Sequence, residues 1–187
     1  MPERVTLDAD ALADVELPLP SVGTGRLVSE VRLFLPGRGP ALDGARRRQR
    51  LDRYHLGSLT RERSYKLRGA TGKGELKVLT GRSPLIDVID SVSAEPELWA
   101  KFPVRLAEPP AGWIELAKDI WRAGPVEVTW ITSDLGSWWT LAVQVRATTC
   151  PRLPAEVSRH LTDRREQVSC RSYAAWLVEN LGLDQDS

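Results

Sequence analysis

The stretch from Arg61 to Leu79, RERSYKLRGATGKGELKVL, constrains the fold of this chain more than any other. Its centre carries three glycines, which give the backbone the freedom that a tight turn needs. Both flanks carry residues that suit a strand: Tyr65 and Leu67 before the turn, and Leu76 and Val78 after it. The pattern predicts a β-hairpin, and therefore a fold in which antiparallel strands are neighbours.

The charged residues of this hairpin fall on one face. Successive side chains of a strand point to opposite sides, so Lys66 and Arg68 share a face of the first strand. By the same count Lys73, Glu75 and Lys77 share a face of the second. Such a face is either exposed to water, as one face of an antiparallel sheet usually is, or turned toward an anion. Phosphate is the obvious anion, because several Lys and Arg side chains can bind it together through charge-assisted hydrogen bonds.

The composition is that of one soluble domain, with 187 residues, 42% of them hydrophobic and 27% charged. We expect an N-terminal arm over residues 1–25, which is acidic and then broken by prolines, and a single domain over residues 26–187. The net charge of +1 excludes a general attraction to nucleic acid or to membranes. Any anion site must therefore come from the local arrangement of charges.

Several familiar signals are missing from the sequence. No apolar run is long enough to cross a bilayer and the first residues are no signal peptide, which predicts a cytoplasmic protein without a membrane partner. Cys150 and Cys170 lack the spacing of a CxxC or zinc site, which favours two free thiols over a disulfide. No Walker, GxSxG, HExxH or dinucleotide motif occurs. His55 and His160 have no evident partner, which favours packing or surface roles over a catalytic base.

Segments with alternating or β-rich patterns predict further strands. They are Arg26–Leu35, Leu51–Leu56, Phe102–Leu106, Val126–Ile131 and Trp138–Thr148. The last two, joined by the turn SDLGS, form a second predicted hairpin. Because the strands are joined as hairpins, the predicted class is an antiparallel α+β domain, for which a barrel is one possible form.

Apolar residues at helical spacing predict the helices. They are two short helices within Ser83–Phe102, interrupted at Pro96, and single helices over Ala111–Trp121, Pro154–Leu161 and Tyr173–Leu181. A short helix around Ala11–Val15 or a loose arm is expected near the N-terminus. The basic run ARRRQR at Ala45–Arg50 is predicted to be a solvated loop or helix end, with a phosphate-steering lip as the alternative.

The order of these motifs resembles that of the CYTH superfamily, the triphosphate tunnel metalloenzymes. SEVRL offers Glu30 and Arg32 for the opening acidic and basic strand, and LDRYHL offers Asp52 and Tyr54 for the next motif. KLR and GELKVL follow as the paired basic residues and the acidic and basic strand. WRAGPVEVTWITSDLGSWWTLAVQV matches the later outline, and SYAAWL resembles the closing helix, with Trp176 in place of a leucine. The resemblance covers Arg26 to Leu183.

The resemblance implies a closed antiparallel β-barrel with flanking helices, whose charged faces line a tunnel for a triphosphate. In such a tunnel Arg and Lys bind phosphate, while carboxylates hold Mg²⁺ or Mn²⁺ as the cofactor. The catalytic residues so implied are Glu30, Lys66, Arg68 and Glu75; the further ligand-binding residues are Arg32, Lys77, Arg122 and Arg146; the metal ligands are Glu30, Glu75 and Glu127.

Three positions depart from the pattern of the family. Val28 stands where the first glutamate belongs, and Ala142 and Gln144 stand where the late strand carries two carboxylates. Alanine cannot replace a carboxylate as a metal ligand, and a neutral amide oxygen coordinates only weakly. The resulting site is more positive than in the family, which favours binding of a polyanion over metal-assisted phosphoryl transfer.

Two functions follow from this set of residues. The first is a divergent CYTH-like phosphohydrolase that acts on a phosphorylated or triphosphorylated small molecule. The second is a catalytically degenerate CYTH-like domain that binds a nucleotide, polyphosphate or RNA end without turnover, nucleic acid being the less favoured ligand. Glu30, Glu75 and Glu127 favour the first function, while Ala142 and Gln144 favour the second. The third alternative is an ordinary α+β interaction domain.

Overall fold

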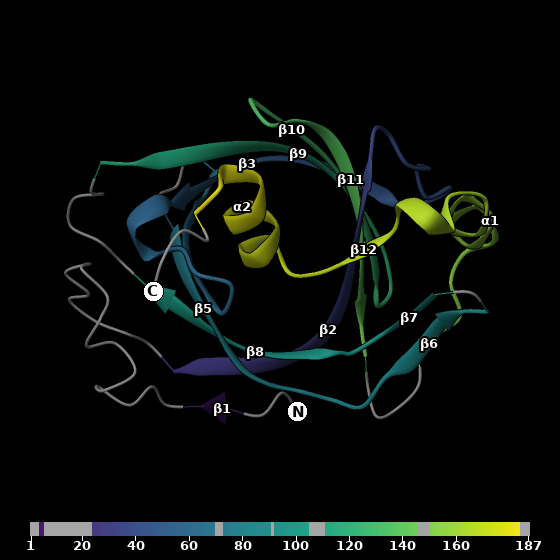
Figure 1. Ribbon diagram of the computed structural model, residues 1–187, viewed down its shortest axis with the longest axis horizontal. Coiled ribbons are helices and arrows are strands. Elements are labelled where there is room, and N and C mark those ends of the chain that lie inside the picture. Colours follow the sequence, from purple (N-terminus) through teal and green to yellow (C-terminus); the bar gives the residue numbers. More distant parts are fainter. Residues whose placement is uncertain are drawn as a thin grey trace.

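The centre of the protein is a closed barrel of eight antiparallel strands (Figure 1). The computed structural model describes residues 4–5, 24–69, 73–90, 92–104, 111–145 and 150–183. Around the barrel the strands follow the order β2, β11, β10, β9, β3, β4, β5, β8, and β8 pairs again with β2 to close it. The barrel strands are β2 (Gly25–Pro36), β3 (Arg46–His55), β4 (Arg63–Arg68), β5 (Lys73–Arg82), β8 (Glu97–Val104), β9 (Trp113–Ala123), β10 (Val126–Ser133) and β11 (Gly136–Gln144).

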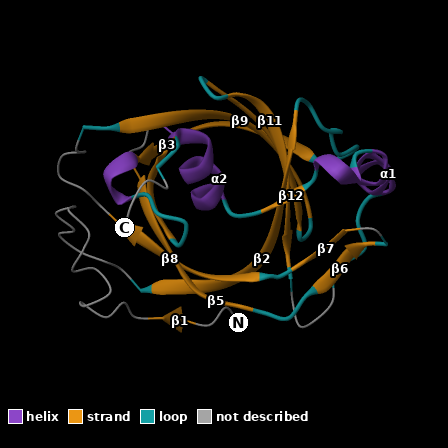
Figure 2. Ribbon diagram, viewed as in Figure 1, coloured by secondary structure: helices purple, strands orange, loops and turns teal. Residues whose placement is uncertain are grey.

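The remaining elements are short and lie against this barrel, except α2, which lies within the ring of strands (Figure 2). They are β1 (Arg4–Val5), β6 (Ile86–Ile89), β7 (Val92–Ala94), β12 (Ser169–Cys170), two 3-10 turns (Leu56–Ser58 and Arg165–Gln167), α1 (Ala155–Asp163) and α2 (Tyr173–Leu181). None of the helices in the described part of the chain could span a bilayer. The predicted class, α+β with an antiparallel barrel and flanking helices, is confirmed.

Both predicted hairpins are present. β4 pairs with β5 so that Lys66 lies opposite Glu75 and Arg68 opposite Lys73. Gly69 has a positive φ of 59° at the start of the turn, and the next three residues lie outside the described part of the chain. β10 pairs with β11 along its whole length, from Val126 opposite Val143 to Ser133 opposite Gly136.

The helices predicted within Ser83–Phe102 and over Ala111–Trp121 are wrong, because β6, β7, β8 and β9 occupy these segments. The reason is that the barrel wall is packed on both sides, which hides the alternation of an ordinary strand. In β9, Leu116 packs inside the barrel, while Trp121 packs in a cluster on its outer face. Apolar residues on both faces imitate helical spacing.

The basic run at Ala45–Arg50 is also a strand rather than a loop or helix end. It begins β3, which is longer than predicted and pairs with β9 from Arg46 opposite Arg122 to His55 opposite Trp113. The strand predicted over Leu51–Leu56 is its second half. The arginines are held in a strand by β9, which pairs with every residue of Arg46–His55, whereas β4 pairs only with Asp52–Tyr54 farther along β3.

Both predicted C-terminal helices are present. α2 has the predicted bounds, since Ser172 Oγ accepts a hydrogen bond from the Ala175 amide at the start and Gly182 adopts a φ of 65° at the end. α2 lies within the ring of strands (Figure 1). Its Trp176 stacks on Phe34 of β2, with ring centroids 5.1 Å apart. α2 and these aromatic residues fill one end of the barrel interior.

α1 and the β6–β7 hairpin lie on the outside of the barrel (Figure 1). Val157 and Leu161 of α1 and Val88 and Val92 of the hairpin join a cluster with the outward side chains of β2, β10 and β11. His160 of α1 packs its ring against Trp139, as predicted for a packing residue. Cys150 and Cys170 are both free thiols.

Candidate functional site

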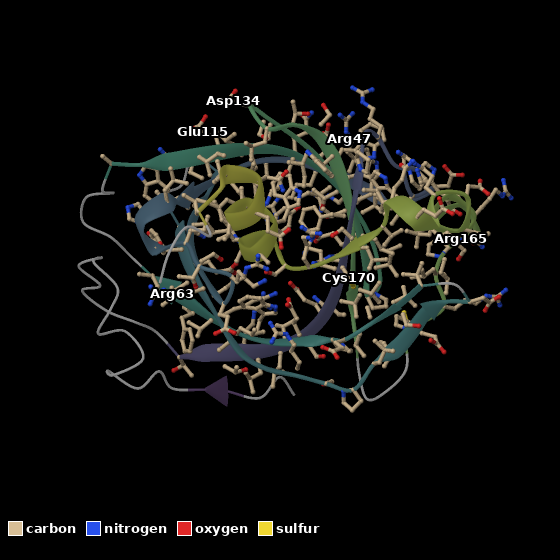
Figure 3. All side chains as sticks on the ribbon, in the orientation of Figure 1. Arg47, Arg63, Glu115, Asp134, Arg165 and Cys170 are labelled. Carbon is tan, nitrogen blue, oxygen red and sulfur yellow. The ribbon has the colours of Figure 1, made fainter. Side chains whose placement is uncertain are left out.

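The end of the barrel interior that α2 does not fill is a charged cavity of about 750 Å³. Figure 3 shows nitrogen- and oxygen-tipped side chains filling the ring of strands. Twelve Arg and Lys but only three Glu line this cavity. They are Arg26, Arg32, Arg46, Arg47, Arg48, Arg50, Lys66, Arg68, Lys77, Lys101, Lys118 and Arg122, with Glu30, Glu75 and Glu127. The cavity is therefore strongly positive although the chain as a whole carries a net charge of only +1.

The charged face of the β4–β5 hairpin points into this cavity. Lys66 and Lys77 are only 5% and 7% exposed, so a face open to bulk water is excluded for them. Leu76 lies on the opposite face of β5, in an apolar cluster with Tyr65. Period-two alternation thus places the cations inside the barrel and the apolar residues outside. Lys73, at the exposed start of β5, is the member of the predicted face that does not line the cavity.

Glu30 on β2 holds two lysines together. Lys77 Nζ and Lys101 Nζ each donate a hydrogen bond of 2.9 Å, to different carboxylate oxygens of Glu30. Burial alone would raise the pKa of Glu30, but Lys77, Lys101 and the nearby Arg32 outweigh it and hold this pKa well below its usual value. Burial and the neighbouring cation Lys101 lower the pKa of Lys77 to about 7, against the opposing effect of Glu30.

Glu75 on β5 forms a second ion-paired group. Arg68 donates a hydrogen bond of 2.6 Å to Glu75, and Lys66 Nζ lies 3.3 Å from the same carboxylate oxygen. Burial would raise the pKa of Glu75, but the two cations lower it to about 2. The four residues predicted to be catalytic, Glu30, Lys66, Arg68 and Glu75, therefore all lie in the cavity, and both of the glutamates are ion-paired.

A third group surrounds Asp52 of β3, which is fully buried. Lys118 Nζ donates to Asp52 at 2.9 Å, Arg50 lies 2.7 Å from it and Lys66 3.7 Å from it. Lys118 also donates to the Tyr54 hydroxyl at 3.0 Å. Burial would raise the pKa of Asp52, but Lys118 and Lys66 keep it far below its usual value.

Arg32 and Tyr173 connect the cavity to α2. The Arg32 guanidinium lies 4.4 Å from the centre of the Tyr173 ring and donates a hydrogen bond of 3.0 Å to Thr140. Lys118 Nζ lies 3.7 Å from the same ring. Two cations therefore lie over the Tyr173 ring, an arrangement favoured by cation–π attraction. This ring forms the part of the cavity wall that α2 supplies.

The predicted ligand-binding residues lie as follows. Arg32, Lys77 and Arg122 line the cavity. Arg122 at the exposed end of β9 donates a hydrogen bond of 2.8 Å to Glu127. Arg146 lies outside the described residues. Lys101 and Lys118 line the cavity but were missed, because both lie in segments that were predicted as helices and not as inward-facing barrel strands.

The three predicted metal ligands do not fit a divalent cation. Glu30, Glu75 and Glu127 each contact their own Lys or Arg partners. The described residues contain no group of three or more His, Cys, Asp or Glu side chains that could hold a metal ion. Ala142 lies opposite Glu127 on one side and opposite Arg32 on the other, while Gln144 lies opposite Glu30. The register thus places neutral residues beside the glutamates where Mg²⁺ would need further carboxylates.

No protein-family model matches the sequence, and no curated protein matches it. Among solved structures, a conserved hypothetical protein from Pyrococcus furiosus is similar, with 13% identity. The match covers 78% of this chain and 98% of that chain at a TM-score of 0.40, which is too remote to support an argument about function.

Proposed function

We propose that this protein is a divergent CYTH-like domain that binds a phosphate-rich ligand in its barrel cavity without a divalent cation and without turnover. The observation that carries the proposal is the excess of twelve Arg and Lys over three Glu in the lining of one barrel cavity. A cytoplasmic location, expected from the sequence, is part of this proposal.

The internal ion pairs of the cavity support binding rather than catalysis. Arginine and lysine already held by Glu30, Glu75 and Asp52 lose little side-chain freedom when a phosphate arrives. Phosphate oxygens can then accept charge-assisted hydrogen bonds from the cations that surround them. Metal-assisted transfer instead needs carboxylates that are available to a cation bridging the phosphates, and these carboxylates are already paired.

A slow, metal-independent phosphohydrolase is the second candidate function. The observation that favours it is Lys77, whose pKa of about 7 suits proton donation to a leaving group near neutral pH. This candidate acts on the same phosphorylated or triphosphorylated small molecules. Phosphate release in the presence of a chelator separates it from simple binding.

Calorimetric titration with tripolyphosphate in EDTA tests the proposal. Lys66→Ala or Arg68→Ala should each weaken binding by about 1.5–3 kcal/mol, the strength of a hydrogen bond to a charged group. Arg159→Ala, on the exposed outer side of α1, is the control, because it removes one positive charge away from the cavity. Equal affinities of all three variants and the parent protein would refute a ligand site inside the barrel.

A further inference from the structure

The cavity has an inner and an outer compartment that differ in burial and in charge compensation. The inner cations contact carboxylates: Lys77 and Lys101 contact Glu30, and Lys66 and Lys118 contact Asp52. The outer compartment is an arginine rim, formed by Arg26, Arg46, Arg48 and Arg122. All four rim residues are exposed and line the cavity.

The arginines of the rim have fewer carboxylate partners than the cations of the inner compartment. Within the described part of the chain, Arg26, Arg46 and Arg48 form no ion pair, whereas Arg122 is paired with Glu127. Strand pairing also sets like charges side by side, since Arg46 lies directly opposite Arg122, and Arg26 directly opposite Lys101. Like charges opposite each other destabilise a sheet, and a bound anion would relieve this repulsion.

The rim continues into the inner compartment along one strand. Every second position of β3 carries an arginine, at Arg46, Arg48 and Arg50, and Asp52 continues this face. Neighbouring arginines of the row are therefore about 7 Å apart along the strand. From Arg46 to Arg50 the strand covers about 14 Å. A row of cations of this length suits an anion that extends from the inner compartment to the mouth of the cavity.

We propose that the arginine rim is a second anion-binding subsite, and that the ligand is a linear inorganic polyphosphate long enough to occupy both compartments. The inference rests on the proposed function and specifies the ligand of the same cavity. The rim binds the outer part of the chain, while Lys66, Arg68 and Lys77 bind the inner end.

The lining favours an inorganic chain over a nucleic acid. Proteins that bind single-stranded nucleic acid stack its bases on aromatic side chains. Tyr173 is the one aromatic residue among the described residues of the lining, and at 7% exposed it is buried between Arg32 and Lys118. The rim itself offers arginines but no ring on which a base could stack.

Binding of a length series of linear polyphosphates, starting with tripolyphosphate, tests the rim by calorimetry in EDTA. Affinity per site should rise with chain length and then level off. Arg46→Ala with Arg48→Ala should weaken binding of the long chains about tenfold or more, the effect of one lost charged hydrogen bond. The same double variant should change the affinity for tripolyphosphate by less than about twofold, while Lys66→Ala should weaken binding of every chain length.

Arg159→Ala with Arg165→Ala is the matched control, since it removes two positive charges from exposed positions of and beside α1 (Figure 3 labels Arg165). The rim variant should keep or raise the thermal midpoint of the parent protein, because it removes the repulsion between Arg46 and Arg122. Equal losses for short and long chains, or none for long chains, would overturn the rim subsite while leaving the inner site intact. Tighter binding of a single-stranded RNA of equal charge would overturn the choice of ligand. Absence of binding at every chain length would overturn the proposed function itself.

Discussion

Replacing Glu30 by glutamine should destabilise the protein and tighten ligand binding at the same time. Glu30 is 5% exposed and accepts hydrogen bonds of 2.9 Å from both Lys77 and Lys101. Removing one partner of a buried ion pair costs about 3–5 kcal/mol, because the other charge is left uncompensated. Lys77 can release its proton, since its pKa is about 7. We therefore expect the lower end of this range, about 3 kcal/mol in the free energy of unfolding at pH 7.

The effect on binding has the opposite sign, because Glu30 repels a phosphate in the same cavity. Two charges about 5 Å apart at an effective dielectric constant of about 20 interact by about 3 kcal/mol. Partial deprotonation of Lys77 offsets some of this gain. Glu30→Gln should therefore bind tripolyphosphate at least about tenfold more tightly than the parent protein in EDTA, which corresponds to about 1.4 kcal/mol.

Urea denaturation measures the first effect and calorimetry measures the second. Glu166→Gln is the control, because it removes one negative charge at an exposed position outside the barrel and should alter neither quantity by more than about 0.5 kcal/mol. Weaker binding by Glu30→Gln would refute the reasoning. If that weakening appeared only with Mg²⁺ or Mn²⁺, Glu30 would be a metal ligand and the protein a candidate metalloenzyme.

Three further predictions follow from the site. Burial lowers the pKa of Lys77 to about 7, whereas an unfolded lysine has a pKa of about 10.4; the unfolded chain therefore binds the extra proton between these values, and stability should rise with pH by up to about 1.4 kcal/mol per unit. Denaturation at pH 7.5 and pH 9 checks this, and an equal slope in Lys77→Met would contradict it. Ala142→Glu with Gln144→Glu should create phosphate release that depends on Mg²⁺ or Mn²⁺. An assay without such a gain would count against the alignment of these two positions with the carboxylates of the family's late strand. Trp176→Ala should lower the free energy of unfolding by about 3–5 kcal/mol, because a fully buried indole is lost from the end of the barrel; a change under about 1 kcal/mol would contradict the role of α2 as its packed closure.

The elements that the sequence predicted correctly are those with local signals. α2 was predicted with its observed bounds because Gly182 marks its end. The β4–β5 hairpin was predicted because glycines mark its turn and charged residues alternate with apolar ones on its strands. β9 was predicted as a helix because Leu116 and Trp121 pack on opposite faces of a wall that is covered on both sides, and no single-face pattern survives there.

The same error explains the missing members of the site. Lys118 becomes an inward-facing residue only when Trp113–Ala123 is a strand, and alternation from Leu116 then places Lys118 in the cavity. Asp52 was noted as part of a motif, but its three cationic partners come from β3, β4 and β9 and could not be inferred from any one segment. The sequence predicted which residues carry charge, whereas strand pairing decides which of them meet.

The carboxylates of the cavity have a structural reason to be present that does not involve a metal. A lysine buried without a partner becomes neutral rather than charged, because burial disfavours the ammonium form. Glu30, Glu75 and Asp52 each lie within 3 Å of a cation and so keep a positive charge inside the barrel. Ala142 and Gln144 need not be carboxylates for this purpose. The one cation directly opposite them is Arg32, and a guanidinium stays charged without a carboxylate partner. Three of the four carboxylates, Glu30, Glu75 and Asp52, thus lie beside a lysine, while Glu127 pairs with Arg122. This distribution favours a binding cavity over a catalytic metal centre.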